Sequence, residues 1–88
     1  MAWTIDYTIT AKNQLLKLDK QHARRIVEFM DERVAALGNA REQGKALTGP
    51  LENFWRYRVG DFRIICDIQD GKLIVLVVKV GNRRDIYH

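Results

Sequence analysis

The stretch from Trp55 to Cys66 constrains the fold of this chain more than any other. Two runs in which aromatic and β-branched residues alternate with other side chains flank Gly60-Asp61, a pair suited to a tight turn with a positive φ at its first position. This pattern predicts a β-hairpin in which Arg58 faces Arg63. Because successive side chains of a strand point to opposite faces, the two faces of the hairpin are expected to differ in chemistry.

One face of the predicted hairpin is apolar and the other carries three arginines. The apolar face comprises Trp55, Tyr57, Val59, Phe62, Ile64 and Cys66, and the other comprises Arg56, Arg58, Arg63, Ile65 and Asp67. Like charges opposite each other destabilise a sheet, so stability alone does not explain Arg58 across from Arg63. Two interpretations remain open: a solvated face whose arginines spread into water, or a surface for a polyanion, since the guanidinium fork matches phosphate.

The length of 88 residues predicts one small domain, residues 1–88, with a single core. The net charge is +4, and the residues from 54 onward hold seven Lys/Arg against four Asp/Glu, so +3 of it lies with the predicted sheet. The sequence has no 18-residue apolar run and no signal-peptide pattern at its start, which predicts a cytoplasmic protein without a membrane partner. The lone Cys66 is expected to be a small core residue.

The region before the hairpin predicts one strand and two helices. Residues 3–7 alternate as a short strand, and Thr8 or Thr10 is expected to cap a helix over 11–18. Asp19 is expected to cap a longer amphipathic helix that ends at Gly38. His22 is assigned to the outer face of that helix, far from the arginines, and residues 39–53 are expected to form a loop.

The region after the hairpin predicts one more strand. Asp70-Gly71 is a second hairpin turn signal, and the unbroken apolar run that follows, ending at Val80, predicts a central strand covered on both faces. The tail beyond Gly81 is basic and is expected to fold back near the arginines. The fold class is therefore α+β: two N-terminal helices packed on a small, mostly antiparallel four-stranded sheet, in the order β-α-α-β-β-β.

Counting residues excludes several chemistries. The chain has no serine for a serine-based triad, and one cysteine with two histidines cannot form a zinc site of the usual spacing. No glycine-rich phosphate loop is present, so no metal or cofactor is expected.

What remains is a set of cations with one tyrosine: Arg56, Arg58, Arg63, Arg83, Arg84 and Tyr87. Cations can stabilise the charge that develops on a phosphate, and RNA supplies its own 2′-OH nucleophile, so we expect metal-independent RNA cleavage to a 2′,3′-cyclic phosphate and a 5′-OH.

Three segments carry a resemblance to a known family. They are Lys45-x-Leu47-x-Gly49-x-Leu51, Trp55-Arg56-Tyr57-Arg58-Val59-Gly60-Asp61-Phe62-Arg63-Ile64-Ile65, and Val80-Gly81-Asn82-Arg83-Arg84-Asp85-Ile86-Tyr87. Together they resemble the RelE family of the RelE/ParE toxin superfamily. The resemblance implies a type II toxin–antitoxin toxin that enters the ribosomal A site, contacts rRNA and cleaves mRNA. It also implies a small cognate antitoxin as partner, with operator DNA bound only through the antitoxin complex.

The resemblance also assigns roles to individual residues. Arg63 matches an arginine that binds and stabilises the scissile phosphate, and Arg83 matches one assigned to phosphate stabilisation or leaving-group protonation. Tyr87 matches a catalytic tyrosine that stacks on the base or assists proton transfer. The matches to RNA-binding residues are Arg56, Arg58, Lys45 and Arg84. Three positions depart from the family pattern: Asn82 replaces a common histidine, Cys66 a common tyrosine and Asn53 a common glycine. Asparagine is no general acid or base, so the sequence leaves the proton-transfer group open.

Two other functions stay open at this point. One is a ParE-like toxin that inhibits DNA gyrase without catalysis, and the other is a regulatory member that binds antitoxin and operator DNA only. The arginines of the hairpin together with Arg83 and Tyr87 favour the nuclease. The sequence does not fix the codon preference, the fold of the antitoxin or the stoichiometry of the complex.

Overall fold

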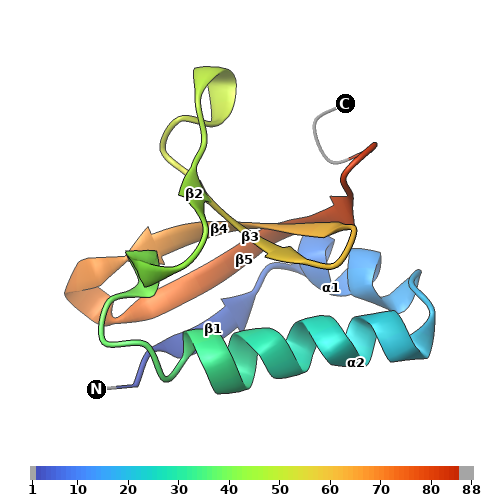
Figure 1. Cartoon of the computed structure of the whole chain (residues 1–88), viewed down its shortest axis with the longest axis horizontal. Coiled ribbons are helices and arrows are strands. Elements are labelled where there is room, and N and C mark those ends of the chain that lie inside the picture. Colours follow the sequence, from blue (N-terminus) through green and yellow to red (C-terminus); the bar gives the residue numbers. More distant parts are fainter. Residues whose placement is uncertain (1, 86–88) are drawn as a thin grey trace.

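A computed structural model describes residues 2–85 (Figure 1). Its elements follow one another as β1 (Thr4–Tyr7), α1 (Ile9–Leu16), α2 (Lys20–Glu28), the π-helical segment η1 (Phe29–Val34), the 3-10 turn η2 (Ala40–Glu42), β2 (Lys45–Ala46), the 3-10 turn η3 (Gly49–Leu51), β3 (Trp55–Val59), β4 (Phe62–Gln69), the 3-10 turn η4 (Asp70–Lys72) and β5 (Ile74–Asn82). The predicted α+β class and the order of the helices and long strands are confirmed.

The sheet has five strands, in the order β1-β5-β4-β3-β2, where four were expected. The additional strand is β2, which pairs with β3 through only two residues, Lys45 and Ala46. So short a strand has no alternating pattern to detect. The sheet is also mixed: β1 lies parallel to β5, while the other three pairs of neighbours are antiparallel.

The central hairpin has the predicted register. Val59 pairs with Phe62 and Arg58 with Arg63, so Gly60-Asp61 is the turn. Gly60 has φ of 58°, a conformation that costs glycine little because it has no Cβ. A two-residue turn fixes which side chains share a face, and the apolar and arginine faces are therefore as the sequence indicates.

The helices cover one face of the sheet (Figure 1). Thr8 caps α1 by accepting a hydrogen bond from Ala11 N–H at 3.1 Å, and this cap starts the helix two residues earlier than expected. Asp19 caps α2 as predicted, through Gln21 N–H at 3.0 Å. The regular helix gives way to η1 at Phe29, and this segment ends at Val34, before the predicted stop at Gly38.

The core lies between these helices and the sheet. From the helices, Ile26, Met30 and Val34 are fully buried at i, i+4 and i+8. They belong to one cluster with fully buried sheet residues, among them Tyr57, Ile64, Cys66, Val75 and Val77. This packing fixes which face of each strand remains outside the core.

The predicted hairpin turn at Asp70-Gly71 is confirmed, and it is longer than two residues. Asp70, Gly71 and Lys72 form a 3-10 turn, and Leu73 after it adopts φ of 55°. However, β5 is not covered on both faces: Val75 and Val77 are fully buried, while Leu76 between them is only partly buried. The unbroken apolar run therefore does not mark a strand with two covered faces.

Candidate functional site

The face of the sheet opposite the helices carries two rows of residues that run across the strands. The pairing registers align Arg58, Arg63 and Gly81 in the first row, and Lys45, Arg56, Ile65 and Lys79 in the second. Directly paired residues share a face of the sheet, so both rows lie on the same side. We call this surface, defined by those seven residues, the cationic face.

Charges are separated along this side of the sheet. The cations lie toward the turn of the β3–β4 hairpin, whereas Asp67 and Asp6, which both pair with Leu76, lie farther along the strands. The Asp67 carboxylate accepts a hydrogen bond from the Gln69 side chain at 3.1 Å. Within residues 2–85 the one ion pair joins Arg41 to Asp70 at 2.8 Å, so no carboxylate in that part of the chain forms an ion pair with Lys45, Arg56, Arg58 or Lys79. Glu28 and Glu32 do line a hollow together with Arg58.

Arg63 is the most buried of the predicted site residues. Its exposed fraction is 7%, and its Nη1 donates to the carbonyl oxygens of Gly60 at 3.3 Å and Phe62 at 3.2 Å. The expectation that the hairpin presents three guanidinium groups to solvent is therefore wrong for this residue. The reason is its position on β4, an inner strand with neighbours on both sides, from which the side chain reaches back to the turn.

The end of β5 brings Arg83 to the same end of the hairpin. Arg83 N–H donates to the carbonyl of Asp61 at 2.9 Å, which ties the tail to the turn residue next to Gly60. The Asn82 side chain then accepts from Arg84 N–H at 3.1 Å, and the Asn82 carbonyl accepts from Asp85 N–H at 2.9 Å. Arg83 and Arg84 are exposed and line a hollow of about 280 Å³. Up to residue 85 the tail therefore lies beside the turn of the hairpin, and the predicted approach to the arginine side chains stays a prediction.

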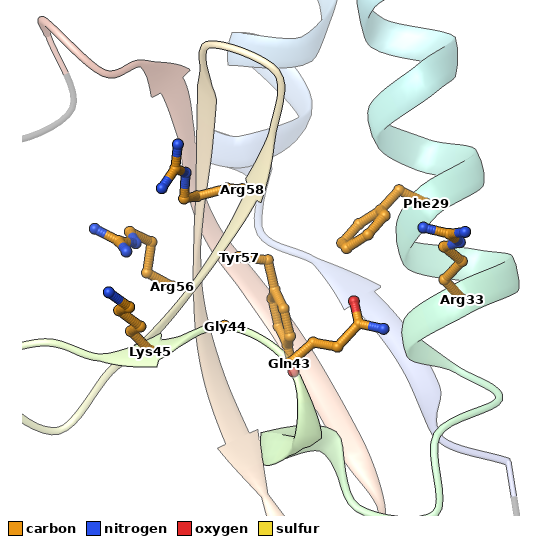
Figure 2. A pocket seen from close by; sticks show the side chains of 8 residues that line it. All are labelled: Phe29, Arg33, Gln43, Gly44, Lys45, Arg56, Tyr57 and Arg58. Carbon is orange, nitrogen blue, oxygen red and sulfur yellow. The ribbon is translucent and has the colours of Figure 1, made fainter.

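A groove lies along the edge of β3 (Figure 2). It has a volume of about 330 Å³ and is lined by Phe29, Arg33, Gln43, Gly44, Lys45, Arg56, Tyr57 and Arg58. Figure 2 shows Arg56 and Arg58 pointing to one side of β3, while Tyr57 and Phe29 lie on the other. The Arg56 Nε is buried without a hydrogen-bond partner.

The loop before β2 is held in place by side chains of the sheet. Trp55 Nε1 donates to the carbonyl of Gln43 at 2.7 Å, and the buried Tyr57 hydroxyl donates to the carbonyl of Ala40. Gly44 has φ of 86° and passes so close to β3 that a Cβ there would lie 2.3 Å from the carbonyl oxygen of Arg56. These contacts fix the position from which Lys45 joins the cationic face.

Three acid groups in residues 2–85 have raised pKa values. Burial raises the pKa of the Tyr57 hydroxyl and of the Cys66 thiol. Burial and the neighbouring Asp31, which accepts a hydrogen bond from Tyr7 at 3.1 Å, raise the pKa of the Tyr7 hydroxyl. These groups therefore stay protonated at neutral pH, and Tyr87, the predicted catalytic tyrosine, lies outside the described residues.

His22 contacts the hairpin, contrary to its expected distance from it. Its ring centroid lies 5.0 Å from that of Phe62. Phe62 belongs to the helix-covered face of β4, whereas Arg63 belongs to the opposite face. His22 is therefore near the turn in space but separated from the cationic face by the sheet.

The described residues offer no metal site and no membrane span. No group of three or more His, Cys, Asp or Glu side chains in residues 2–85 is arranged to hold a metal ion. In the same range, no helix has the length and apolarity needed to cross a bilayer.

The structure brings together most of the predicted site residues and adds one that sequence reasoning missed. Lys45, Arg56, Arg58 and Arg63 share the cationic face, and Arg83 and Arg84 follow β5 at its hairpin end. The added residue is Lys79, which stands opposite Ile65. Only the register could have identified it, because Val78, an extra residue of β5 at an irregularity of the ladder, breaks the simple alternation.

Comparisons with known proteins cover almost the whole chain. A family model described as the ParE toxin of the parDE type II toxin–antitoxin system matches residues 5–87. The chain is 31% identical to toxin RelG of Mycobacterium tuberculosis, over 99% of this chain and 98% of that protein. It is 32% identical to toxin RelE of the same organism, over 91% of this chain and 80% of that protein.

Solved structures share the fold. The toxin–antitoxin complex RelBE2 from Mycobacterium tuberculosis contains a chain that matches with a TM-score of 0.87 at 27% identity, covering 97% of this chain and 95% of that one. A chain of the RelE–RelB complex from Pyrococcus horikoshii matches with a TM-score of 0.67 at 24% identity, covering 97% and 99%.

Proposed function

The chain belongs to the RelE/ParE superfamily of type II toxin–antitoxin toxins, and from this premise we propose that it is a ribosome-dependent mRNA endonuclease. It cleaves mRNA in the ribosomal A site and thereby stops translation in the cytoplasm. The observation that supports this proposal best is the cationic face, where Arg58 pairs with Arg63 and no carboxylate of the described chain forms an ion pair with Arg58. A surface where cations gather in this way attracts a polyanion.

The reaction needs no metal. The 2′-oxygen of one nucleotide attacks the adjacent phosphorus, the bond from phosphorus to the 5′-oxygen breaks, and the products are a 2′,3′-cyclic phosphate and a 5′-OH. The proton of the 2′-OH leaves as the attack proceeds, and the 5′-oxygen takes up a proton as it departs. Negative charge grows on the non-bridging oxygens, and fixed cations stabilise this charge.

In this proposal Arg63 and Arg83 supply those cations. The bonds from Arg63 Nη1 to the turn carbonyls orient its guanidinium plane, and the bond from Arg83 N–H to Asp61 fixes the point at which the second arginine leaves the sheet. The guanidinium group of arginine keeps its positive charge in proteins, so both residues act by charge and hydrogen bonding. Tyr87 is the proposed participant in proton transfer and base stacking.

Arg56, Arg58, Lys45 and Arg84 bind the RNA backbone in this proposal. Arg56 and Arg58 point from β3 to the side of the sheet that carries the two rows, and Lys45 pairs with Arg56 from the edge strand (Figure 2). The buried Arg56 Nε without a protein partner is a donor that a phosphate oxygen can satisfy. A cognate RelB-type antitoxin is the proposed protein partner, and the complex reaches operator DNA through the antitoxin.

A second candidate function is inhibition of DNA gyrase without catalysis. The description of the matching family model, a ParE toxin, favours it. On this alternative the cationic face contacts protein, and Arg63 and Arg83 have no catalytic role.

The deciding experiment is brief expression in bacterial cells, followed by mapping of mRNA 5′ ends, for the wild-type chain and for Arg83→Ala. We expect new 5′ ends within translated codons that disappear in Arg83→Ala and do not form on RNA free of ribosomes. Growth arrest with intact mRNA and an induced DNA-damage response would replace the nuclease with the gyrase inhibitor. A normal growth rate without either effect would favour the purely regulatory function.

A further inference from the structure

We propose that Lys79, together with Arg56 and Lys45, forms a second phosphate-binding row that holds the RNA phosphate next to the cleaved one. The ligand is the backbone of single-stranded RNA. This inference rests on the proposed function, because it takes the neighbouring row with Arg63 as the place of cleavage.

The register gives the row its dimensions. Lys45 pairs with Arg56, Arg56 with Ile65, and Ile65 with Lys79, so the row crosses four strands. With strands about 4.8 Å apart, the row is about 14 Å long. It lies two residues away from the first row on each strand, a separation of about 7 Å along the strands. A spacing of this size is comparable to one nucleotide step of an extended RNA strand.

The chemistry of the second row also favours a phosphate. Lys79 has no carboxylate partner in residues 2–85, and Asp67, the nearest acid along β4 on that face, is held by Gln69. Ile65, which is buried, lies between Arg56 and Lys79 in the register and adds no charge to the row. The buried and unpaired Nε of Arg56 is a second observation that points to a missing acceptor, since a buried donor without a hydrogen bond is unfavourable.

The position of Lys79 favours RNA over an acidic peptide. Extended peptides bind sheets mainly by pairing with the backbone of an edge strand. Lys79 is on β5 and Ile65 on β4, which has a strand on each side. The pairing of β5 with β1 ends at Val77, and beyond it the Thr8 hydroxyl donates to the Val78 carbonyl while Val80 N–H donates to the Gln14 side chain. The main chain there has no free edge for a peptide. Repeating phosphates need only cations, and the two rows provide them.

The test is the salt dependence of RNA binding by Lys79→Gln, with Lys72→Gln as the matched control. Lys72 is exposed in the turn η4, before β5, and lies outside both rows. The probe is a short single-stranded RNA with 2′-deoxy substitutions that prevent cleavage, titrated with the isolated toxin at several salt concentrations. For single strands, the slope of log K against log salt changes by about 0.7 for each phosphate neutralised.

We expect Lys79→Gln to lower the magnitude of that slope by about 0.7 and Lys72→Gln to leave it unchanged. Lys79→Arg should restore the slope, because it keeps the charge. Thermal unfolding of each variant separates loss of binding from loss of fold, since a purely structural role would shift the melting temperature and leave the slope as it was.

Two results would overturn the inference. One is a slope for Lys79→Gln equal to that for Lys72→Gln, while Arg58→Gln lowers it. The other is loss of antitoxin binding in Lys79→Gln with RNA binding intact, which would assign the row to an acidic peptide. If Arg58→Gln and Lys79→Gln both leave RNA binding unchanged, the proposed nuclease function fails along with the inference.

Discussion

Replacing Gly44 by alanine should destabilise the protein more than the same change at Gly49 or Gly71. Gly44 has φ of 86°, and a Cβ there would lie 2.3 Å from the Arg56 carbonyl oxygen and 2.6 Å from Trp55 Nε1. Two costs therefore add at this position: an unfavourable backbone conformation and a steric conflict with the backbone of β3. The chain offers variants that separate the two.

Gly49 and Gly71 are the controls. Gly49 has φ of 70°, and a Cβ there would have no atom within 4 Å, so Gly49→Ala tests the conformational cost alone. That cost is about 1–2 kcal/mol, reduced by the lower entropy of the unfolded chain. Gly71 has open space and no positive φ, so Gly71→Ala should be neutral or stabilising by up to about 1 kcal/mol.

Gly44→Ala adds the steric conflict to the conformational cost. The new methyl group can be accommodated only if the loop moves away from β3, which breaks the two-residue pairing of β2 and the bond from Trp55 to Gln43. With about 0.5–1.5 kcal/mol for each hydrogen bond, the total loss should be about 2–4 kcal/mol. A domain of this size loses about 4–8 °C in melting temperature per kcal/mol.

The assay is thermal and urea-induced unfolding, with all variants made in an Arg83→Ala background so that toxicity does not limit expression. We expect stability to decrease in the order Gly71→Ala, Gly49→Ala, Gly44→Ala. RNA affinity should fall in Gly44→Ala beyond its fall in Gly49→Ala, because Lys45 is displaced with the loop. Equal stability of the variants at positions 44 and 49 would refute the close approach to β3 as the source of the cost.

Three more predictions follow from the sheet. Tyr57→Phe should lower the free energy of unfolding by about 1–3 kcal/mol, measured by urea titration, because the buried carbonyl of Ala40 loses its donor. Stability of the wild-type protein should fall as the pH rises above about 9, since the folded state raises the pKa of Cys66, Tyr57 and Tyr7 and so keeps protons that the unfolded chain releases. Circular dichroism against pH should show this loss, and it should be smaller in Tyr57→Phe. Arg58→Thr should raise the melting temperature, because it removes a like charge opposite Arg63, while weakening RNA binding.

Much of the fold follows from local sequence signals. Gly60-Asp61 sets the hairpin register, and that register determines which side chains of β3 and β4 share the cationic face. Thr8 and Asp19 cap the two helices because each supplies an oxygen to an amide that the helix leaves unpaired. Such signals act over a few residues. The hairpin register and the two helix caps, which depend on them, were predicted correctly from the sequence.

The features that were missed depend on contacts between distant segments. The two-residue strand β2 exists because Trp55 and Gly44 draw the loop against β3. The turn after β4 is fixed in part by Arg41, which binds the Asp70 carboxylate through two hydrogen bonds at 2.8 and 3.0 Å. Neither contact produces a periodic pattern, because each joins segments that are distant in the sequence.

The site residues also divide into those placed by local sequence signals and those placed by contacts between distant segments. Arg56 and Arg58 were placed correctly by alternation, whereas the burial of Arg63 depends on strand order, which brings Gly81 of β5 beside it. Lys79 joins the second row only because the ladder between β4 and β5 shifts by one residue after Ile65. An irregularity of this kind reverses the parity of every residue beyond it, so no count along the sequence could have placed Lys79 on the cationic face.

The pairing of Arg58 with Arg63 is itself an argument about function. Cross-strand like charges cost stability, and an opposite pair at the same position would contribute roughly 0.2–1 kcal/mol instead. The chain has acids close by in sequence, Asp61 at the turn and Asp67 farther along β4, but neither neutralises Arg58. On the proposed function, an RNA phosphate bound at the cationic face offsets the repulsion between Arg58 and Arg63.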